Sequence, residues 1–196
     1  ALRTLAGMRR GALEPDVVDF SQAANACARS GQWQHALGVI NSMPLHQVNL
    51  DVVLYNTAIS ACGTGELWEN ALAYVREMRE GHLEPSQISY SSAISACDKG
   101  GQWLQALYQL DSMRRMRVSP QAGSYLAAIC ACRTSEKWQH ALATLADMHV
   151  SHAKPTESCY NTAISAFEKS GQWQWAISHL RDMQQRHLEP DVISYS

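Results

Sequence analysis

The chain has 196 residues, with 16 lysines and arginines against 18 aspartates and glutamates and a formal net charge of −2. This balance excludes a global basic field, so nucleic acid could be attracted only by a local stripe of cations. No apolar run approaches the roughly 18 residues that a membrane-spanning helix needs. The opening stretch ALRTLAGMRR has a helical pattern but neither a starting methionine nor a targeting segment, and we expect the chain to be a fragment.

In chain order, the same residue types return every 35 positions. The tryptophan series is Trp33, Trp68, Trp103, Trp138 and Trp173, an aromatic series runs from Phe20 to Tyr195, and a methionine series runs from Met8 to Met183. A fixed period of this length indicates a repeat array rather than one globular core. We expect a single array over 1–196, in which 1–16 is the second half of a truncated repeat, complete repeats cover 17–51, 52–86, 87–121, 122–156 and 157–191, and 192–196 begins a further repeat.

Each repeat contains two helical patterns. In repeat 52–86 the first pattern is Tyr55, Ala58, Ile59 and Cys62, and the second is Trp68, Ala71, Leu72, Val75 and Met78. Both follow the i, i+3, i+4, i+7 spacing of a helix face. Gly31, Gly101 and Gly171 separate the two patterns, and the proline near the end of most repeats is expected to stop the second helix. We therefore predict an all-α fold of antiparallel helix pairs, with the periodic tryptophans in the core and Trp175 exposed.

Most of the cysteines also follow the period. Cys27, Cys62, Cys97 and Cys132 are 35 residues apart, and Phe167 fills the fifth slot. A position that accepts cysteine or phenylalanine is a buried apolar slot rather than a metal or disulfide site. Since no CxxC pair with zinc-ligand spacing occurs, we expect no metal, no cofactor and no catalytic residues, so that the chain is not an enzyme.

Several phrases resemble the pentatricopeptide-repeat pattern. They include LDVVLYNTAISAC (50–62), EPSQISYSSAISAC (84–97) and the closing EMREGHLEP (77–85). The resemblance implies a right-handed superhelical α-solenoid whose first helices line a concave groove, and single-stranded RNA as the partner, with one base for each repeat. It also implies a role in RNA processing, stability or translation in an organelle, either chloroplast or mitochondrion.

In this family two side chains read each base, one directly after the aromatic residue and one after the closing proline. Carried onto this chain, the reading pairs are Ser21 with Asp51, Asn56 with Ser86, Ser91 with Gln121, Leu126 with Thr156, and Asn161 with Asp191. Val18, Val53 and Ile88 take the position that packs on base faces, which Gly123 and Ser158 occupy in the last two repeats. Arg29, Lys99 and Lys169 take a position near phosphate. The resemblance implies the register purine, pyrimidine with cytosine ahead of uracil, any base, any base, uracil.

Other interpretations of the same residues stay open. Asp16, Asp51 and Asp191 are placed to cap helices, and Arg29, Lys99 and Lys169 to complement helix dipoles. The main alternative function is a solenoid that binds protein partners, and a third is an array that folds but binds nothing well. Small polar residues after the aromatic position favour RNA over a peptide.

Overall fold

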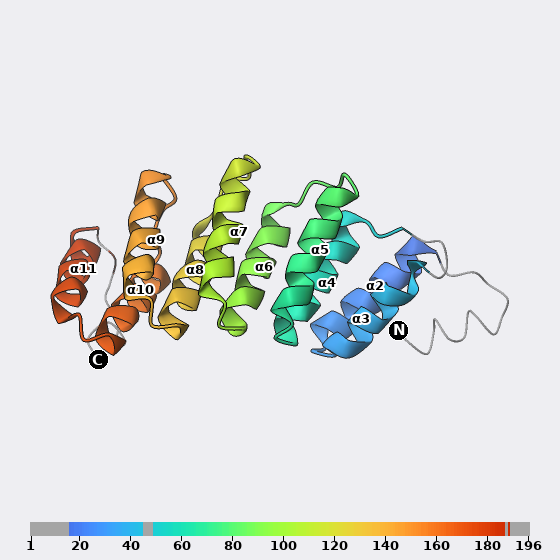
Figure 1. Ribbon diagram of the computed structural model, residues 1–196, viewed down its shortest axis with the longest axis horizontal. Helices are drawn as coiled ribbons and strands as arrows, with labels where there is room; N and C mark the ends of the chain where they lie inside the picture. Colours follow the sequence, from blue (N-terminus) through green and yellow to red (C-terminus); the bar gives the residue numbers. More distant parts are fainter. Residues whose placement is uncertain (1–15, 45–48, 187, 189–196) are drawn as a thin grey trace. The chain divides into compact units, whose positions relative to one another are not determined.

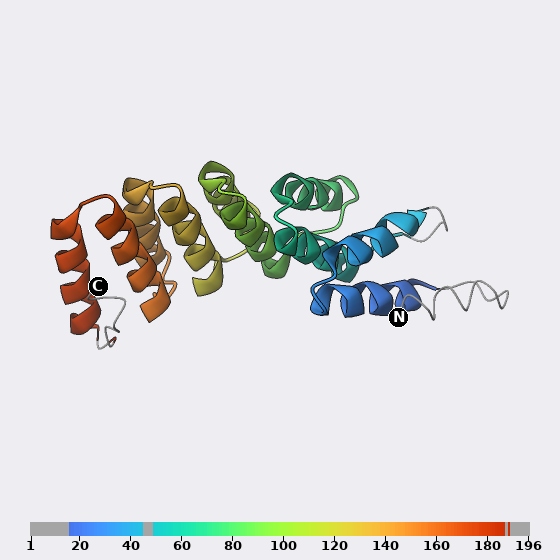
Figure 2. The ribbon, with the colours of Figure 1, turned by 90° about the horizontal axis from the view of Figure 1, so that it is seen from below.

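The computed structural model describes residues 16–44, 49–186 and 188, and within them all regular structure is helical (Figures 1 and 2). The first helices of the pairs are α2 (Val17–Arg29), α4 (Val52–Thr64), α6 (Gln87–Lys99), α8 (Ala122–Thr134) and α10 (Glu157–Lys169). The second helices are α3 (Trp33–Ser42), α5 (Trp68–Glu80), α7 (Trp103–Arg115), α9 (Trp138–Val150) and α11 (Trp173–Gln185). Both series keep the 35-residue spacing, which confirms the all-α repeat fold. The division into repeats, like the handedness of the superhelix, stays a prediction.

The chain divides into two compact units between Ala96 and Cys97, within α6. In the N-terminal unit, α2 packs on α3 and α4, and α4 packs on α3 and α5. In the C-terminal unit, α8 packs on α7, α9 and α10, and α10 packs on α9 and α11. First helices therefore contact first helices of the neighbouring pair, which places one face of each unit on α2 and α4 or on α8 and α10.

A left-handed residue ends each first helix. Gly31, Gly101 and Gly171 have φ of +72°, +67° and +67°, as the predicted terminators should. The next residue closes the turn, since the Gln32 N–H donates to the Cys27 carbonyl at 3.0 Å in the pattern of a Schellman motif. In the other two pairs, Glu66 and Glu136 take this left-handed conformation with φ of 58° and 57°. The backbone is strained at both residues, because a Cβ is unfavourable in this conformation.

The prolines do not stop the second helices, so that prediction is wrong. Helix α5 ends at Glu80, five residues before Pro85, and His82 with φ of 56° makes the turn. The Leu83 N–H then donates to the Met78 carbonyl at 2.8 Å. Pro85 instead lies two residues before α6, where its fixed φ suits an extended entry into the next helix.

The periodic slots form the core of each unit. The cysteine and phenylalanine slots are buried, as predicted, and the described members of the methionine series are fully buried. The alanine three residues after each of the first four tryptophans is also fully buried, so each second helix lies close to its neighbours. Burial raises the pKa of the Cys62 thiol to about 11 and that of Cys97 and Cys132 to about 12, which keeps these thiols protonated and unreactive.

The tryptophans are not core residues, which corrects the prediction. Each begins a second helix and is only half-buried, except Trp173, which is 63% exposed. A Cβ added to Gly65 would lie 2.7 Å from the ring of Trp33, so this ring covers the turn between the next two helices. The ring of Trp103 lies 4.6 Å from that of His140 in the next pair. Gly65 is therefore required by the close approach of Trp33. Trp175 is 42% exposed, as expected.

Candidate nucleic-acid interface

Three bulky apolar residues are exposed at the start of the first helices. Val18, Val53 and Ile88 are the second residues of α2, α4 and α6, with exposed fractions of 57%, 55% and 62%. All three belong to the N-terminal unit. Their common position puts them beside the predicted reading residues. Large apolar side chains repeated at an exposed position are suited to contact with a flat apolar ligand surface.

The first reading pair combines two hydrogen-bond acceptors. The Ser21 hydroxyl lies in α2 and donates to the Val17 carbonyl at 2.7 Å. Asp51 caps α4 by accepting from the Leu54 N–H at 2.8 Å through Oδ1, which confirms its capping role. The Ser21 proton is thus already in use, so this pair is left with oxygen lone pairs to offer a ligand.

The second reading pair is joined by a third residue. Asn56 on α4 accepts at Oδ1 a hydrogen bond of 2.6 Å from the Ser89 hydroxyl of α6. The Ser86 N–H donates to Ser89 Oγ at 3.0 Å, and the two serine hydroxyl oxygens are 3.2 Å apart. The structure therefore brings Asn56 and Ser86 together through Ser89, which the sequence analysis did not single out. Ser89 has no exposed surface, and its position three residues after Ser86 is the signal of a capping box.

The remaining reading residues are less organised. Ser91 donates to the Ile88 carbonyl at 3.2 Å, and Gln121 stands at the N-cap of α8 without a side-chain cap bond. Leu126 is half-buried in α8. Thr156 precedes α10 with its hydroxyl 3.3 Å from Cys159 Sγ, and Asn161 is half-buried in α10. Asp191 lies outside the described residues.

The predicted phosphate ligands end three first helices. Arg29, Lys99 and Lys169 are the exposed last residues of α2, α6 and α10, where a cation also complements the helix dipole. Next to Lys99, the half-buried Asp98 has its carboxyl pKa raised by burial, an effect that Arg133 and Lys99 oppose. Since this carboxylate is close to a cation, any basic stripe is partly neutralised at α6.

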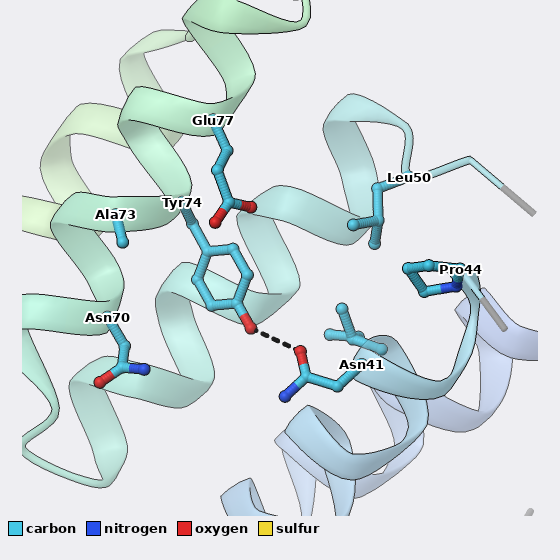
Figure 3. A pocket seen from close by; sticks show the side chains of 8 residues that line it. Asn41, Pro44, Leu50, Asn70, Ala73, Tyr74 and Glu77 are labelled. Atoms are coloured by element: carbon cyan, nitrogen blue, oxygen red, sulfur yellow. Dashed lines mark hydrogen bonds between the residues drawn. The ribbon is translucent and has the colours of Figure 1, made fainter.

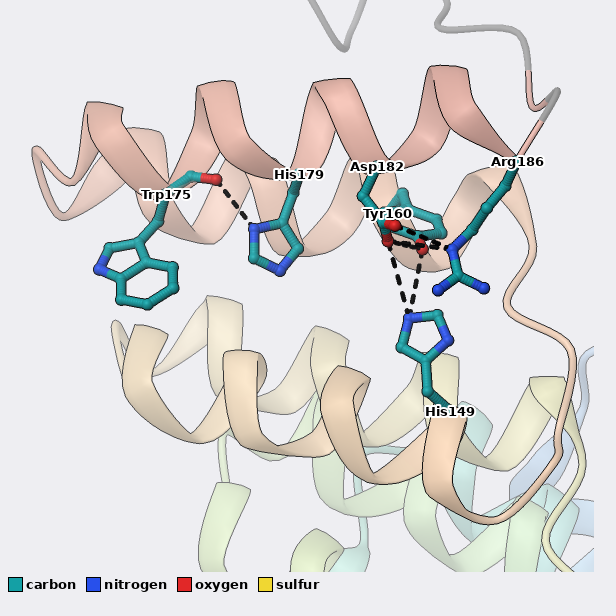
Figure 4. A network of polar contacts seen from close by, with 6 residues as sticks. All are labelled: His149, Tyr160, Trp175, His179, Asp182 and Arg186. Atoms are coloured by element: carbon teal, nitrogen blue, oxygen red, sulfur yellow. Dashed lines mark hydrogen bonds and ion pairs between the residues drawn. The ribbon is translucent and has the colours of Figure 1, made fainter.

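Two polar clusters in the C-terminal unit tie successive helix pairs together. In the first, Arg114 of α7 pairs with Asp147 of α9 and donates at 2.7 Å to the Tyr125 hydroxyl. In the second, His149 Nε2 lies 3.2 Å from the Tyr160 hydroxyl, which donates to Asp182, while the Arg186 Nε donates to Asp182 at 3.0 Å (Figure 4). The signal was present in the sequence, because Arg114 and His149 are 35 residues apart, as are Asp147 and Asp182.

The second cluster lowers the pKa of both His149 and Asp182. Burial first, and then the neighbouring Arg186, lowers the pKa of His149 despite the nearby Asp182 carboxylate. For Asp182, burial works to raise the pKa, but hydrogen bonds from Tyr160 and Arg186 outweigh it and the pKa is lowered. Because Tyr160 gives its only proton to Asp182, its oxygen accepts from His149 Nε2–H. Near neutral pH the cluster therefore holds a neutral histidine.

A hollow of about 390 Å³ lies among second helices of the N-terminal unit (Figure 3). Its lining includes Asn41, Pro44, Leu50, Tyr74 and Glu77. The Tyr74 hydroxyl donates to Asn41 Oδ1 at 2.9 Å, and burial raises the pKa of this phenol to about 12. Pro44 takes the repeat position that Arg114 takes two repeats later, and Glu77 takes the position of Asp182 three repeats later. Because proline carries no charge, this helix pair lacks the cation that Arg114 supplies in the first polar cluster.

Within residues 16–44, 49–186 and 188 the helices carry neither a metal-binding cluster nor a membrane span. No group of three or more histidine, cysteine or acidic side chains there could hold a metal ion. None of the helices described has both the length and the apolar character to span a bilayer.

These features define a helical-repeat protein built from 35-residue helix pairs. The family model described as the pentacotripeptide-repeat region of PRORP matches residues 8–195, and the chain belongs to the pentatricopeptide-repeat family. No curated protein matches the chain at a significant level.

Solved structures agree on the fold. The pentatricopeptide repeat protein PPR10 from maize is 24% identical with a TM-score of 0.77, over 92% of this chain and 26% of PPR10. PPR10 in complex with an 18-nt psaJ RNA element is matched at 18% identity and a TM-score of 0.77, over 91% of this chain and 26% of that one. The PPR domain of Arabidopsis thaliana protein-only RNase P 1, in complex with tRNA, is 14% identical with a TM-score of 0.77, over 89% of this chain and 92% of the domain. The chain thus spans about a quarter of the length of PPR10.

Proposed function

We propose that the chain binds single-stranded RNA through the exposed residues of its first helices. The observation that carries this proposal is the repeated exposure of Val18, Val53 and Ile88 beside polar side chains that retain hydrogen-bonding capacity. A nucleic acid base offers two apolar faces and a polar edge, which is the combination that these positions match. The solved complexes of PPR10 with RNA and of the PRORP1 domain with tRNA support the same partner.

In this proposal each base lies between the packing residues of consecutive repeats. The first base is held between Val18 and Val53, and the second between Val53 and Ile88. Packing on base faces tolerates any base, since every base has a flat π-face. Specificity must then come from the polar edge.

The donor and acceptor pattern sets the base preference of the first reading pair. Ser21 and Asp51 offer acceptors, because the Ser21 proton is given to Val17. Guanine presents N1–H and N2–H₂ donors on its Watson–Crick edge, so we expect this pair to favour guanine. An adenine in the same place would offer only one donor group to two acceptors.

The other reading pairs complete the register. Asn56 with Ser86 favours cytosine over uracil, and Asn161 with Asp191 favours uracil. Ser91 with Gln121 and Leu126 with Thr156 discriminate weakly, since the Leu126 side chain cannot form hydrogen bonds. Further, we propose that binding serves RNA processing, stability or translation in a chloroplast or mitochondrion.

Binding of fluorescently labelled RNA at several salt concentrations tests the proposal. We expect unstructured RNA to bind better than duplex RNA of the same length. With Arg29, Lys99 and Lys169 each facing one phosphate, log Kd should change by about 2 per decade of salt, at roughly 0.7 for each contact on a single strand. Replacing all three by glutamine should flatten this slope, whereas Arg76→Gln on the second helix α5 should leave it unchanged. Equal affinity for single strands and duplexes would contradict the proposal.

A further inference from the structure

The hydroxyl of Ser89 lies within hydrogen-bonding distance of Asn56 Oδ1 and of both the N–H and the hydroxyl of Ser86. Ser89 Oγ accepts from the Ser86 N–H at 3.0 Å, and a serine hydroxyl carries a single proton. The nearest acceptor for that proton is Asn56 Oδ1 at 2.6 Å. Since Ser89 has no exposed surface, water does not compete for this proton. The proton therefore goes to Asn56.

This bond orients the Asn56 amide. With Oδ1 directed at Ser89, the two hydrogens of Nδ2 are left for other partners. The Ser86 hydroxyl, 3.2 Å from Ser89 Oγ, is the donor between the two hydroxyls because Ser89 has already given its proton away. Ser86 Oγ also accepts from the Ser89 N–H at 3.4 Å and keeps one further lone pair, while Asn56 keeps donors.

We infer that Ser89 is a positioning residue that fixes which hydrogen-bonding groups Asn56 and Ser86 present to a base. The inference rests on the RNA-binding function proposed above. Donors from Asn56 match the O2 and N3 acceptors of cytosine, and an acceptor on Ser86 matches its N4–H₂ donor. Uracil carries N3–H and O4 at the corresponding places, so a fixed amide discriminates against it. Base preference in one repeat is then set in part by a buried residue of the next.

The same position in other repeats is consistent with this role. Leu54 and Cys159 stand three residues after the N-cap of α4 and α10. The corresponding reading residues one repeat earlier are Ser21 and Leu126. The Ser21 hydroxyl donates its proton to the Val17 carbonyl of its own helix, and the Leu126 side chain has no hydrogen-bonding group. Among the described residues, a hydroxyl at this position follows an amide one repeat earlier at Asn56, and Ser194, which follows Asn161 in the same way, lies outside the described residues.

Ser89→Ala tests the inference, with Ser124→Ala as the matched control. Ser124 is equally buried at the same position of α8, but its hydroxyl has no hydrogen-bond partner. Affinities are measured for short single-stranded RNAs that differ only in the base facing Asn56 and Ser86. We expect Ser89→Ala to reduce the preference for cytosine over uracil by about five-fold, because the freed amide can turn over. Ser124→Ala should leave that preference unchanged, as should either variant at the base facing Ser21 and Asp51.

The outcomes separate the inference from the function on which it rests. If the wild-type chain binds RNA and prefers cytosine, and Ser89→Ala retains that ratio, Ser89 does not position the amide and the inference is overturned. If the wild-type chain binds no RNA, the proposed function fails and the inference fails with it. The side-chain amide resonance of Asn56, assigned with Asn56→Asp, adds a readout without RNA. It should move in Ser89→Ala and stay in place in Ser124→Ala.

Discussion

The N-terminal and C-terminal units share helix lengths and core slots but use their polar and apolar side chains differently. The N-terminal unit exposes Val18, Val53 and Ile88 and arranges Asn56 beside Ser86. At the corresponding packing positions the C-terminal unit has Gly123 and Ser158, which offer no apolar surface. It has instead the two polar clusters around Tyr125 and Tyr160. A core built to one period thus leaves the surface of each repeat free to serve ligand contact or cohesion between repeats.

The largest expected effect tests packing within the N-terminal unit. Gly65→Ala places a Cβ against the Trp33 ring, and overpacking of this kind destabilises by about 1 to 3 kcal/mol. Gly123→Ala is the matched control, because a Cβ there meets nothing within 4 Å. It should be neutral or slightly stabilising, since alanine is the better helix former. Urea unfolding followed by circular dichroism measures both. An unchanged midpoint for Gly65→Ala would show that Trp33 does not depend on this contact.

The next effect concerns contact with RNA, which we expect at Val53 in the N-terminal unit and not at Ser158 in the C-terminal unit. Val53→Ala removes apolar surface that we expect to lie between the first two bases, and affinity for RNA should fall by roughly ten-fold, at the lower end of base-packing energies. Ser158→Ala at the same position of α10 should leave affinity unchanged. Neither variant should alter stability, because both side chains are exposed. A loss of affinity in Ser158→Ala as large as that in Val53→Ala would erase the difference between the units.

A smaller effect is expected at the turns of the C-terminal unit. Glu136 has φ of 57°, and Gly101 has φ of +67° at the corresponding turn. Glu136→Gly should stabilise the chain by up to about 1 kcal/mol, and Gly101→Ala should destabilise it by a similar amount, since a side chain is strained there. Thermal unfolding of both variants gives the comparison. Two shifts of the same sign would be inconsistent with backbone strain as the cause.

The smallest effect is a pH dependence confined to the C-terminal unit. The pKa of His149 is lower in the folded chain than in the unfolded one, so the unfolded chain binds the proton first as pH falls. Stability should therefore decrease as pH falls through the ordinary histidine value of about 6.5, and the loss is complete below the folded pKa. In His149→Gln this loss should be smaller. Melting temperatures at about pH 7.5 and about pH 5.5 measure it, and an identical loss in the variant would assign the effect to another group.

Periodicity made most of the fold predictable from the sequence. A period of 35 places equivalent residues in equivalent environments, so the cysteine, phenylalanine and methionine slots could be assigned to the core. The period alone does not show how completely the neighbouring repeat buries a given side chain. Trp33 was assigned to the core although it lies half-buried over the turn beside Gly65, because burial there depends on the neighbouring repeat. The prolines were assigned to the wrong helix end, since His82 can adopt the turn conformation without glycine.

The candidate site was predictable to a smaller extent. The cap made by Asp51 is confirmed. Val18, Val53 and Ile88 are exposed, and their contact with bases stays a prediction. The role of Ser89 could not be read from it, because Asn56 and Ser89 are 33 residues apart and meet only when α4 and α6 pack together. Which bases the reading pairs select stays a prediction.

Selection of bound sequences from a random single-stranded RNA pool is the most direct test of the central claim, that the first helices read bases and that the N-terminal unit reads them most strongly. We expect an enriched purine followed by a pyrimidine opposite the N-terminal unit, then two weakly selected bases and a uracil opposite Asn161. Asn161→Thr should weaken the uracil preference and leave the first two bases unchanged. A folded chain that enriches no motif would show that the first helices do not read bases.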